Sequence, residues 1–228
     1  MLHSWVGFTN NRQRNLPCSL AERGDPWRSE GDTMSAGQGD FGVIAEGLLA
    51  GTTVATDQGW LPVETLRAGD RVVTFDHGMR PVKAVRISKL WTAAQGAPRA
   101  VWPLLIPARV LGNRSETRLL PEQSVLIESD AAEEMYGDPF TMVAAGTLEG
   151  YMGITRVPPT RELTVVSLKF EGDEVVYTNG TMLVHCPNPR PAMVATADEL
   201  MSAEMTALYQ KLTDQQARSL VEAMAQSA

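Results

Sequence analysis

The chain has 228 residues, of which 43% are hydrophobic, and its 20 basic and 27 acidic residues give a formal net charge of -7. This length suits one domain with flanking segments, and the hydrophobic content is enough for a core, which excludes a chain that is disordered throughout. An acidic chain without a block of Lys or Arg argues against nucleic acid as the main partner and against an electrostatic membrane anchor.

Residues 1–41 are polar, rich in Gly, Ser and Asn, and without hydrophobic periodicity, which predicts a disordered leader. The leader has no apolar segment of the signal-peptide kind, and the chain has no apolar run of about 18 residues that could form a membrane-spanning helix. The sequence therefore favours a cytoplasmic protein, while secretion without a signal peptide stays open. Translation can begin at Met1 or at Met34, near the end of the leader.

Residues 42–190 are predicted to form an all-β domain. Their apolar side chains alternate over short runs that are separated by turn-forming residues, which is the period of strands and not of helices. The two runs 163–170 and 174–184 are separated by Glu171-Gly172-Asp173, which is expected to connect them as a hairpin. In chain order, the earlier runs are 54–56, 60–66, 71–76, 81–91, 117–129 and 140–146.

Glycines mark three of the expected turns. Gly59, Gly69 and Gly78 lie where hairpins need a residue that tolerates positive φ. Asp70 follows Gly69 and can accept the backbone N–H bonds that hold its turn. The expected core side chains of this stretch are Val54, Trp60, Val63, Leu66, Val72 and Val82.

The stretch from Gly47 to Val82 combines these residues at fixed offsets, and it resembles the first half of a Hint domain, the hedgehog/intein fold, of the stand-alone bacterial type. The similarity weakens after Trp91 and then resumes, so that it covers roughly residues 43–187. It implies a horseshoe- or barrel-like body of short strands. The residues that carry it in the first half are Gly51, Thr52, Val54, Thr56, Gly59, Trp60, Pro62, Val63, Glu64, Leu66, Gly69, Asp70, Val72, Thr74, Asp76, Gly78, Pro81 and Val82.

In the Hint family, a thiol or hydroxyl on the first residue of the domain attacks the preceding peptide carbonyl, and a histidine assists by polarising or protonating the scissile amide. The resemblance places the attacking residue at Gly47, which has no Cβ to carry such a group, so the acyl shift cannot start there. It places the histidine at Gln123, whose amide can hydrogen-bond but cannot donate and recover a proton at neutral pH.

The last step in intein-like relatives uses an Asn that follows a Val-His pair. Here the corresponding His185 is followed by Cys186. His185 is then a remnant with no Asn to activate, and we expect it to be hydrogen-bonded locally at a strand end. An alternative register of this region places the family's histidine positions at Ser167 and Asp173.

The remaining histidines and cysteines form no recognisable site. His77 is expected to be an exposed turn residue, and His3 lies in the leader. Cys18 and Cys186 are far apart in unlike surroundings, which indicates two free thiols and neither a disulfide framework nor a zinc pattern. No metal, dinucleotide or other cofactor is expected, because the chain has neither a Cys/His cluster nor a phosphate-binding glycine loop.

Residues 191–228 change to helical periodicity and are predicted to form a helical tail. Thr196 is expected to cap a first helix that runs through Leu212. The residues Thr213 to Gln216 fit a capping box that opens a second, short helix. The tail is expected to pack on the β domain or to contact a protein partner, and its helices are the candidate arm for oligomerisation.

Three positions thus depart from the chemistry of the family, namely Gly47, Gln123 and Cys186, while the turn and core residues are kept. The sequence favours a Hint-like domain that lacks self-splicing activity and acts as a binding or interaction module, since a fold does not imply a function. The alternative is an autoproteolytic domain that cleaves or transfers its N-terminal segment.

Overall fold

The computed structural model describes residues 46–90, 97–160, 162–188 and 209–227, all within the unit Thr33–Ala228. The predicted leader, residues 1–41, lies outside the described residues. So does most of the first predicted helix of the tail.

The described residues form short strands, four short 3-10 turns and two α-helices, which confirms the predicted all-β class. The helices are α1 (Asp130–Tyr136) and α3 (Asp214–Ser227). The strands are β1 (Leu48–Leu49), β2 (Thr53–Thr56), β3 (Gly59–Pro62), β4 (Arg71–Thr74), β5 (Gly78–Pro81), β6 (Ala84–Leu90), β7 (Leu104–Ile106), β8 (Thr117–Leu119), β9 (Ser124–Glu128), β10 (Phe140–Ala144), β11 (Thr155–Arg156), β12 (Leu163–Lys169), β13 (Glu174–Thr178) and β14 (Met182–Cys186).

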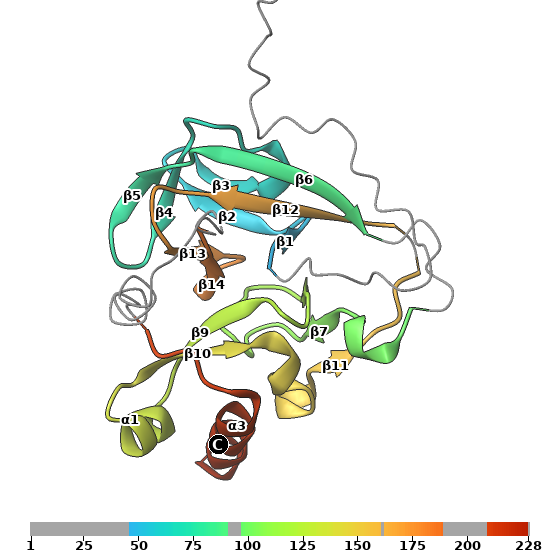
Figure 1. The fold of residues 1–228 in the computed structure, drawn as a ribbon, viewed down its shortest axis with the longest axis vertical. Coiled ribbons are helices and arrows are strands. Elements are labelled where there is room, and N and C mark those ends of the chain that lie inside the picture. Colours follow the sequence, from blue (N-terminus) through green and yellow to red (C-terminus); the bar gives the residue numbers. More distant parts are fainter. Residues whose placement is uncertain (1–45, 91–96, 161, 189–208, 228) are drawn as a thin grey trace, which may run out of the picture. The chain divides into compact units, whose positions relative to one another are not determined.

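The strands form three sheets, and each sheet pairs strands that are far apart in the chain (Figure 1). The largest has the order β10-β9-β14-β13-β2-β4-β5, with β3 paired to β2. The second has the order β1-β12-β6, and the third has the order β11-β7-β8. In the largest sheet, β14 and β13 lie between β9 and β2, and in the second sheet β12 lies beside β1. Residues that are far apart in sequence therefore meet at the ends of β1, β9, β12 and β14.

The hairpin expected between residues 163–170 and 174–184 is wrong. Strand β12 pairs with β6 and β1, whereas β13 turns back into β14 and pairs with it from Thr178↔Met182 to Glu174↔Cys186. The turn residues explain this pairing, since Asn179 and Gly180 both have positive φ (46° and 129°), as an Asn-Gly hairpin requires. The Glu171–Asp173 segment instead carries the chain from one sheet to another.

The glycine turns predicted in the first half are confirmed. Gly59, Gly69 and Gly78 have φ values of 95°, 97° and 63°. Asp70 holds its turn as expected, because its Oδ2 accepts the backbone N–H of Arg67 at 2.7 Å. This part of the chain is therefore specified by local turn chemistry.

The predicted core side chains are buried, with one exception. Val54, Val63 and Val72 have no exposed surface, and Leu66 and Val82 have almost none. Trp60 is 38% exposed, so its assignment to the core is wrong. It lies on β3, which pairs only with β2, and its ring faces the guanidinium of Arg114 at 5.5 Å.

The C-terminal segment packs on the domain. The predicted first helix does not extend to Leu212, because residues 210–212 run along β10, where Met142 exchanges backbone hydrogen bonds with Gln210 and Leu212, both at 2.9 Å. The capping box is confirmed: Thr213 N–H donates to Gln216 Oε1 at 3.0 Å, and Gln216 N–H donates to Thr213 Oγ1 at 3.4 Å.

Helix α3 begins after this box and buries its apolar face in the main core, through Ala217 and Leu220. Its neighbours are α1, β10 and the short 3-10 helix Ala145–Leu148. Among the described residues, no helix is long and apolar enough to cross a membrane.

Candidate functional site

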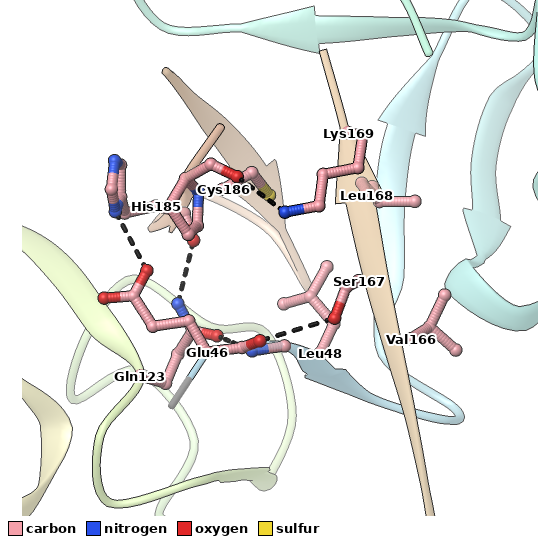
Figure 2. A pocket seen from close by; sticks show the side chains of 11 residues that line it. Glu46, Leu48, Gln123, Val166, Ser167, Leu168, Lys169, His185 and Cys186 are labelled. Carbon is pink, nitrogen blue, oxygen red and sulfur yellow. Dashed lines mark hydrogen bonds and ion pairs between the residues drawn. The ribbon is translucent and has the colours of Figure 1, made fainter. Parts of the chain in front are cut away.

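The four positions singled out in the sequence line one small pocket (Figure 2). Gly47 precedes β1, Gln123 precedes β9, and His185 and Cys186 end β14. Strand β12 closes another side of the pocket and contributes Val166, Ser167, Leu168 and Lys169. The cavity volume is about 30 Å³, which is room for a water molecule and not for an organic ligand.

Gly47 is packed too closely for a larger residue. A Cβ built on it would lie 2.5 Å from Val165 Cγ1 and 3.1 Å from Ser167 Oγ. Valine is branched at Cβ and has little rotamer freedom to move away. The site is therefore shaped around a residue without a side chain, and a cysteine or serine at this position would require β12 to adjust.

Gln123 is fully buried and has its whole amide group satisfied. Its Oε1 accepts the backbone N–H of Gly47 at 2.8 Å. Its Nε2 donates to the carbonyl oxygens of His185 at 2.9 Å and Ser124 at 3.0 Å. Because the two carbonyls accept only from the NH₂ end, Gln123 must present its oxygen to the Gly47 amide.

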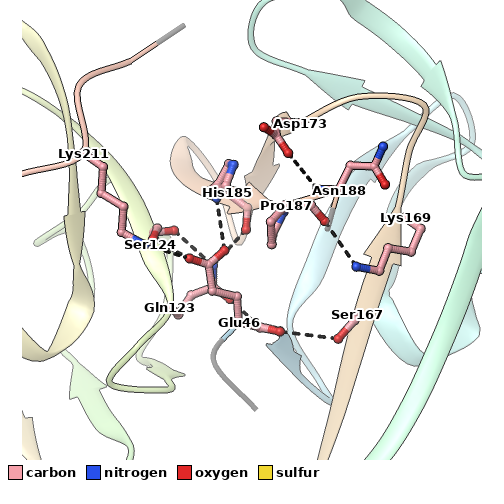
Figure 3. Close-up of polar contacts among 11 residues, drawn as sticks. Glu46, Gln123, Ser124, Ser167, Lys169, Asp173, His185, Pro187, Asn188 and Lys211 are labelled. Carbon is pink, nitrogen blue, oxygen red and sulfur yellow. Dashed lines mark hydrogen bonds and ion pairs between the residues drawn. The ribbon is translucent and has the colours of Figure 1, made fainter. Parts of the chain in front are cut away.

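The residues of the alternative register are separated (Figure 3). The Ser167 hydroxyl donates to the backbone carbonyl of Glu46 at 3.4 Å, so it lies beside the peptide bond that enters β1. Asp173 lies elsewhere and accepts the backbone N–H of Asn188 at 2.7 Å. The structure therefore brings only the first of the two to the pocket.

His185 is hydrogen-bonded, but not locally as expected. Its Nδ1 lies 3.1 Å from Oε2 of Glu46, which is 139 residues away in sequence. Since an ionised carboxylate can only accept a hydrogen bond, the Nδ1–H group of His185 is the donor of this hydrogen bond.

Burial favours the neutral forms of Cys186 and Lys169 by changing the pKa of each side chain. Burial raises the pKa of the Cys186 thiol to about 12. Burial also lowers the pKa of Lys169, whose ammonium group donates to the carbonyl oxygen of Pro187 at 3.4 Å. A thiol with so high a pKa holds its proton at neutral pH and is a poor nucleophile.

Glu46 is the site residue that sequence reasoning missed. Its side chain is 9% exposed, and its carboxylate accepts from Ser124 Oγ at 2.6 Å and Lys211 Nζ at 3.3 Å as well as from His185. Burial alone would raise the pKa of this carboxyl, but the hydrogen bonds from His185 and Ser124 and the charges of His185 and Lys211 outweigh it, and the pKa is lowered. Only its place before Gly47 could have pointed to it.

His77 lies away from this pocket and is an exposed turn residue, as expected. It is in the turn after β4, and its side chain is 37% exposed. Its Nδ1 contacts Oε2 of Glu174 at 2.9 Å, so it also holds the turn against β13. In the part of the chain that the structure describes, no group of three or more His, Cys, Asp or Glu side chains could hold a metal ion.

Comparison with known proteins assigns the family. The family model described as "Hint domain" matches residues 47–183, which is more than half of the chain. The chain belongs to the Hint domain family. No curated protein matches it.

The chain also has distant similarity to two solved structures. A bacterial intein-like domain from Clostridium thermocellum is 14% identical with a TM-score of 0.44, and the alignment covers 61% of this chain and 98% of that one. The gp41-1 intein is 18% identical with a TM-score of 0.38, again over 61% of this chain and 98% of the other. The Hint match begins at Gly47, so the peptide bond at the start of the matched domain joins Glu46 to Gly47.

Proposed function

We propose that this Hint domain does not cleave its own chain and that it acts as a binding module that retains the segment attached through Glu46. The observation that carries the proposal is the environment of the Glu46–Gly47 peptide bond. Gly47 has no side chain with which to attack the carbonyl, and its N–H donates to Gln123 at 2.8 Å.

The missing nucleophile follows from stereochemistry. An N-to-S or N-to-O acyl shift closes a five-membered ring, so the attacking atom must be bonded to Cβ of the residue that follows the carbonyl. Val165 Cγ1 lies 2.5 Å from the place where that Cβ would be. The pocket therefore lacks both the attacking atom and the space for it.

The pocket also lacks a side chain that could donate a proton to the nitrogen of the Glu46–Gly47 bond. The departing amide nitrogen must gain a proton, but Gln123 presents an acceptor to it and has no proton to give through its oxygen. The Nδ1–H group of His185 instead donates a hydrogen bond to the Glu46 carboxylate. The Cys186 thiol, at the place of the family's cyclising Asn, keeps its proton because burial raises its pKa to about 12.

Binding is the role supported by what remains. The turn and core residues of the family pattern are kept, whereas a cavity of about 30 Å³ is too small for a metabolite. A protein partner at the tail would contact the outer face of α3, because the apolar face of α3 is covered by this domain.

One observation favours the alternative, an autoproteolytic domain. The Ser167 hydroxyl donates to the Glu46 carbonyl at 3.4 Å, and a donor there would polarise that carbonyl toward attack. A hydroxyl that lies beside the oxygen is in the position of an activating group and not of the nucleophile.

Trapping with dilute hydroxylamine at neutral pH tests the proposal, because under these mild conditions it cleaves esters and thioesters and leaves ordinary amides intact. The Asn179-Gly180 bond is cleaved only by concentrated alkaline hydroxylamine, and fragments that meet there are scored apart from any that meet at Glu46–Gly47. The full chain and a Ser167→Ala variant are incubated with and without hydroxylamine, and their intact masses are compared. We expect one uncleaved species in all samples. Cleavage at Glu46–Gly47 in the parent chain that is lost in Ser167→Ala would establish the alternative.

A further inference from the structure

Three hydrogen-bond donors from distant parts of the chain converge on the Glu46 carboxylate (Figure 3). The Ser124 hydroxyl and the Lys211 ammonium group reach Oε1 at 2.6 and 3.3 Å, and His185 Nδ1 reaches Oε2 at 3.1 Å. Both carboxylate oxygens are therefore bound, and two of the donors can carry positive charge. This is the donor set that a carboxylate requires when it leaves water.

The donors are placed by the sheet and not by Glu46 itself. Ser124 and His185 lie on β9 and β14, which pair at Leu183↔Leu126 and Val184↔Val125. Ser124 has no exposed surface, so its hydroxyl cannot turn to bulk water.

The third donor is placed by the edge of the same sheet. Lys211 is held by its pairing with Met142 on β10. Its side chain is 58% exposed, so it is the donor through which the site opens to solvent. Strand pairing thus positions the backbones of all three donors independently of the Glu46 carboxylate.

We propose that Ser124, His185 and Lys211 form a carboxylate-binding site that this chain fills with its own Glu46, and that the site takes the carboxylate of an acidic peptide when Glu46 leaves. The inference rests on the proposed function, because Glu46 is held only while it remains joined to Gly47. It also names the chemistry of the partner, which is an acidic side chain or a C-terminal carboxylate.

Occupation by Glu46 has a structural consequence. The carboxylate ties Glu46, two residues before β1, to β9 and β14, and through Lys211 it ties Glu46 to the segment that precedes α3. The two segments that flank the matched domain are thus held at one point. An acidic partner must displace Glu46 and thereby releases both.

Chemical rescue tests the site in the full chain. Glu46→Ala removes the ligand carboxylate and leaves its donors in place, which should lower Tm by roughly 3–10 °C. Sodium propionate at about 50 mM should then restore at least half of that loss, because it binds only the folded state. The same salt should leave the Tm of the parent chain unchanged, since Glu46 already fills the site.

The controls separate a specific site from a salt effect. Glu122→Ala removes an exposed glutamate next to Gln123 and should change neither Tm nor its response to propionate. Sodium chloride at equal ionic strength should not rescue Glu46→Ala, and propionate should not rescue Glu46→Ala/Ser124→Ala. Rescue by chloride, or an equal Tm rise in the parent chain, overturns the proposal.

A second variant keeps the test decisive if Glu46→Ala does not fold. Lys211→Met removes the exposed donor and should lower Tm by roughly 1–3 °C; an unchanged Tm would overturn the proposed three-donor site. The intact mass of every sample is recorded. A cut at Glu46–Gly47 refutes the proposed function, whereas an uncut Glu46→Ala chain that propionate does not stabilise refutes only the carboxylate site.

Discussion

The turns of the first half and the pocket around Gly47 differ in what their residues do. In the turns, Gly59, Gly69 and Gly78 adopt the positive φ that the family pattern needs, and Asp70 holds its own turn. In the pocket, Gly47 and Gln123 hydrogen-bond to each other across 76 residues of sequence. The turn residues therefore act through backbone conformation, whereas the two pocket residues act through a contact between distant parts of the chain.

The pocket residues also contribute hydrogen bonds that hold the fold together. Gln123 satisfies three backbone groups, and Glu46 is bound by three side chains. These side chains therefore support the structure of the pocket. If that is correct, substitutions in the pocket should cost stability, as substitutions in the turns do.

The largest effect is expected at the β13–β14 turn. Gly180 has a φ of 129°, and a Cβ there would lie 2.7 Å from the carbonyl oxygen of Gly112. Gly180→Ala should therefore cost about 3 kcal/mol or more in the free energy of unfolding, measured by urea denaturation. Gly172→Ala, at the other end of β13 with open space around it, is the matched control and should cost almost nothing.

Gln123→Ala should have the next largest effect. It leaves the Gly47 N–H and the His185 carbonyl without their partner and opens a cavity, which together should cost about 2–4 kcal/mol. Gln58→Ala removes an exposed glutamine and should change the urea midpoint little. A Gln123→Ala chain as stable as the parent would contradict a structural role for the pocket.

The pH dependence of Glu46 should be smaller. The pKa of its carboxyl lies below the ordinary value of 4.5 in the folded chain, so its stabilisation is fully present above that pH and is lost as pH falls through the folded pKa. The groups that face it are Ser124, His185 and Lys211. The stability difference between the parent chain and Glu46→Gln should therefore be constant above about pH 5 and should shrink as the pH falls below 4.5.

Urea midpoints of both chains at each pH check this. A difference that stays constant or grows in acid would show that the Glu46 charge does not stabilise the fold.

Trp60→Ala should have the smallest effect, although it belongs to the family pattern. The side chain is 38% exposed and its main polar contact is with the Arg114 guanidinium. We expect a loss of about 1 kcal/mol. Leu66→Ala, on a side chain that is 4% exposed, should cost about 2–5 kcal/mol and shows which residue belongs to the core.

What could be predicted from the sequence was local. Glycines and Asp70 mark turns through the conformations that they permit, so these turns could be placed without knowledge of the sheets. The strand pairing of β12 could not, because its partner β6 lies far back in the chain and only the sheet shows that Asn179-Gly180, and not Glu171–Asp173, closes the hairpin. The alternation of apolar side chains likewise does not show which face of a strand the rest of the domain covers. For this reason the sequence predicted Trp60 to be in the core, although its side chain is exposed.

The site shows the same division. Gly47, Gln123, His185 and Cys186 could be aligned with a family pattern, and the structure places all four around one pocket. The contacts of Glu46 could not be predicted, since its partners lie 78, 139 and 165 residues away and no spacing rule connects them. The carboxylate site exists only in the folded chain.

The central claim is that the Glu46–Gly47 bond persists because no group in the pocket can open it. Intact mass spectrometry of the purified full chain, before and after prolonged incubation at neutral pH, measures this directly. We predict a single species at the full mass of 24.8 kDa at every time. A pair of fragments whose masses meet at Glu46–Gly47 would contradict the account.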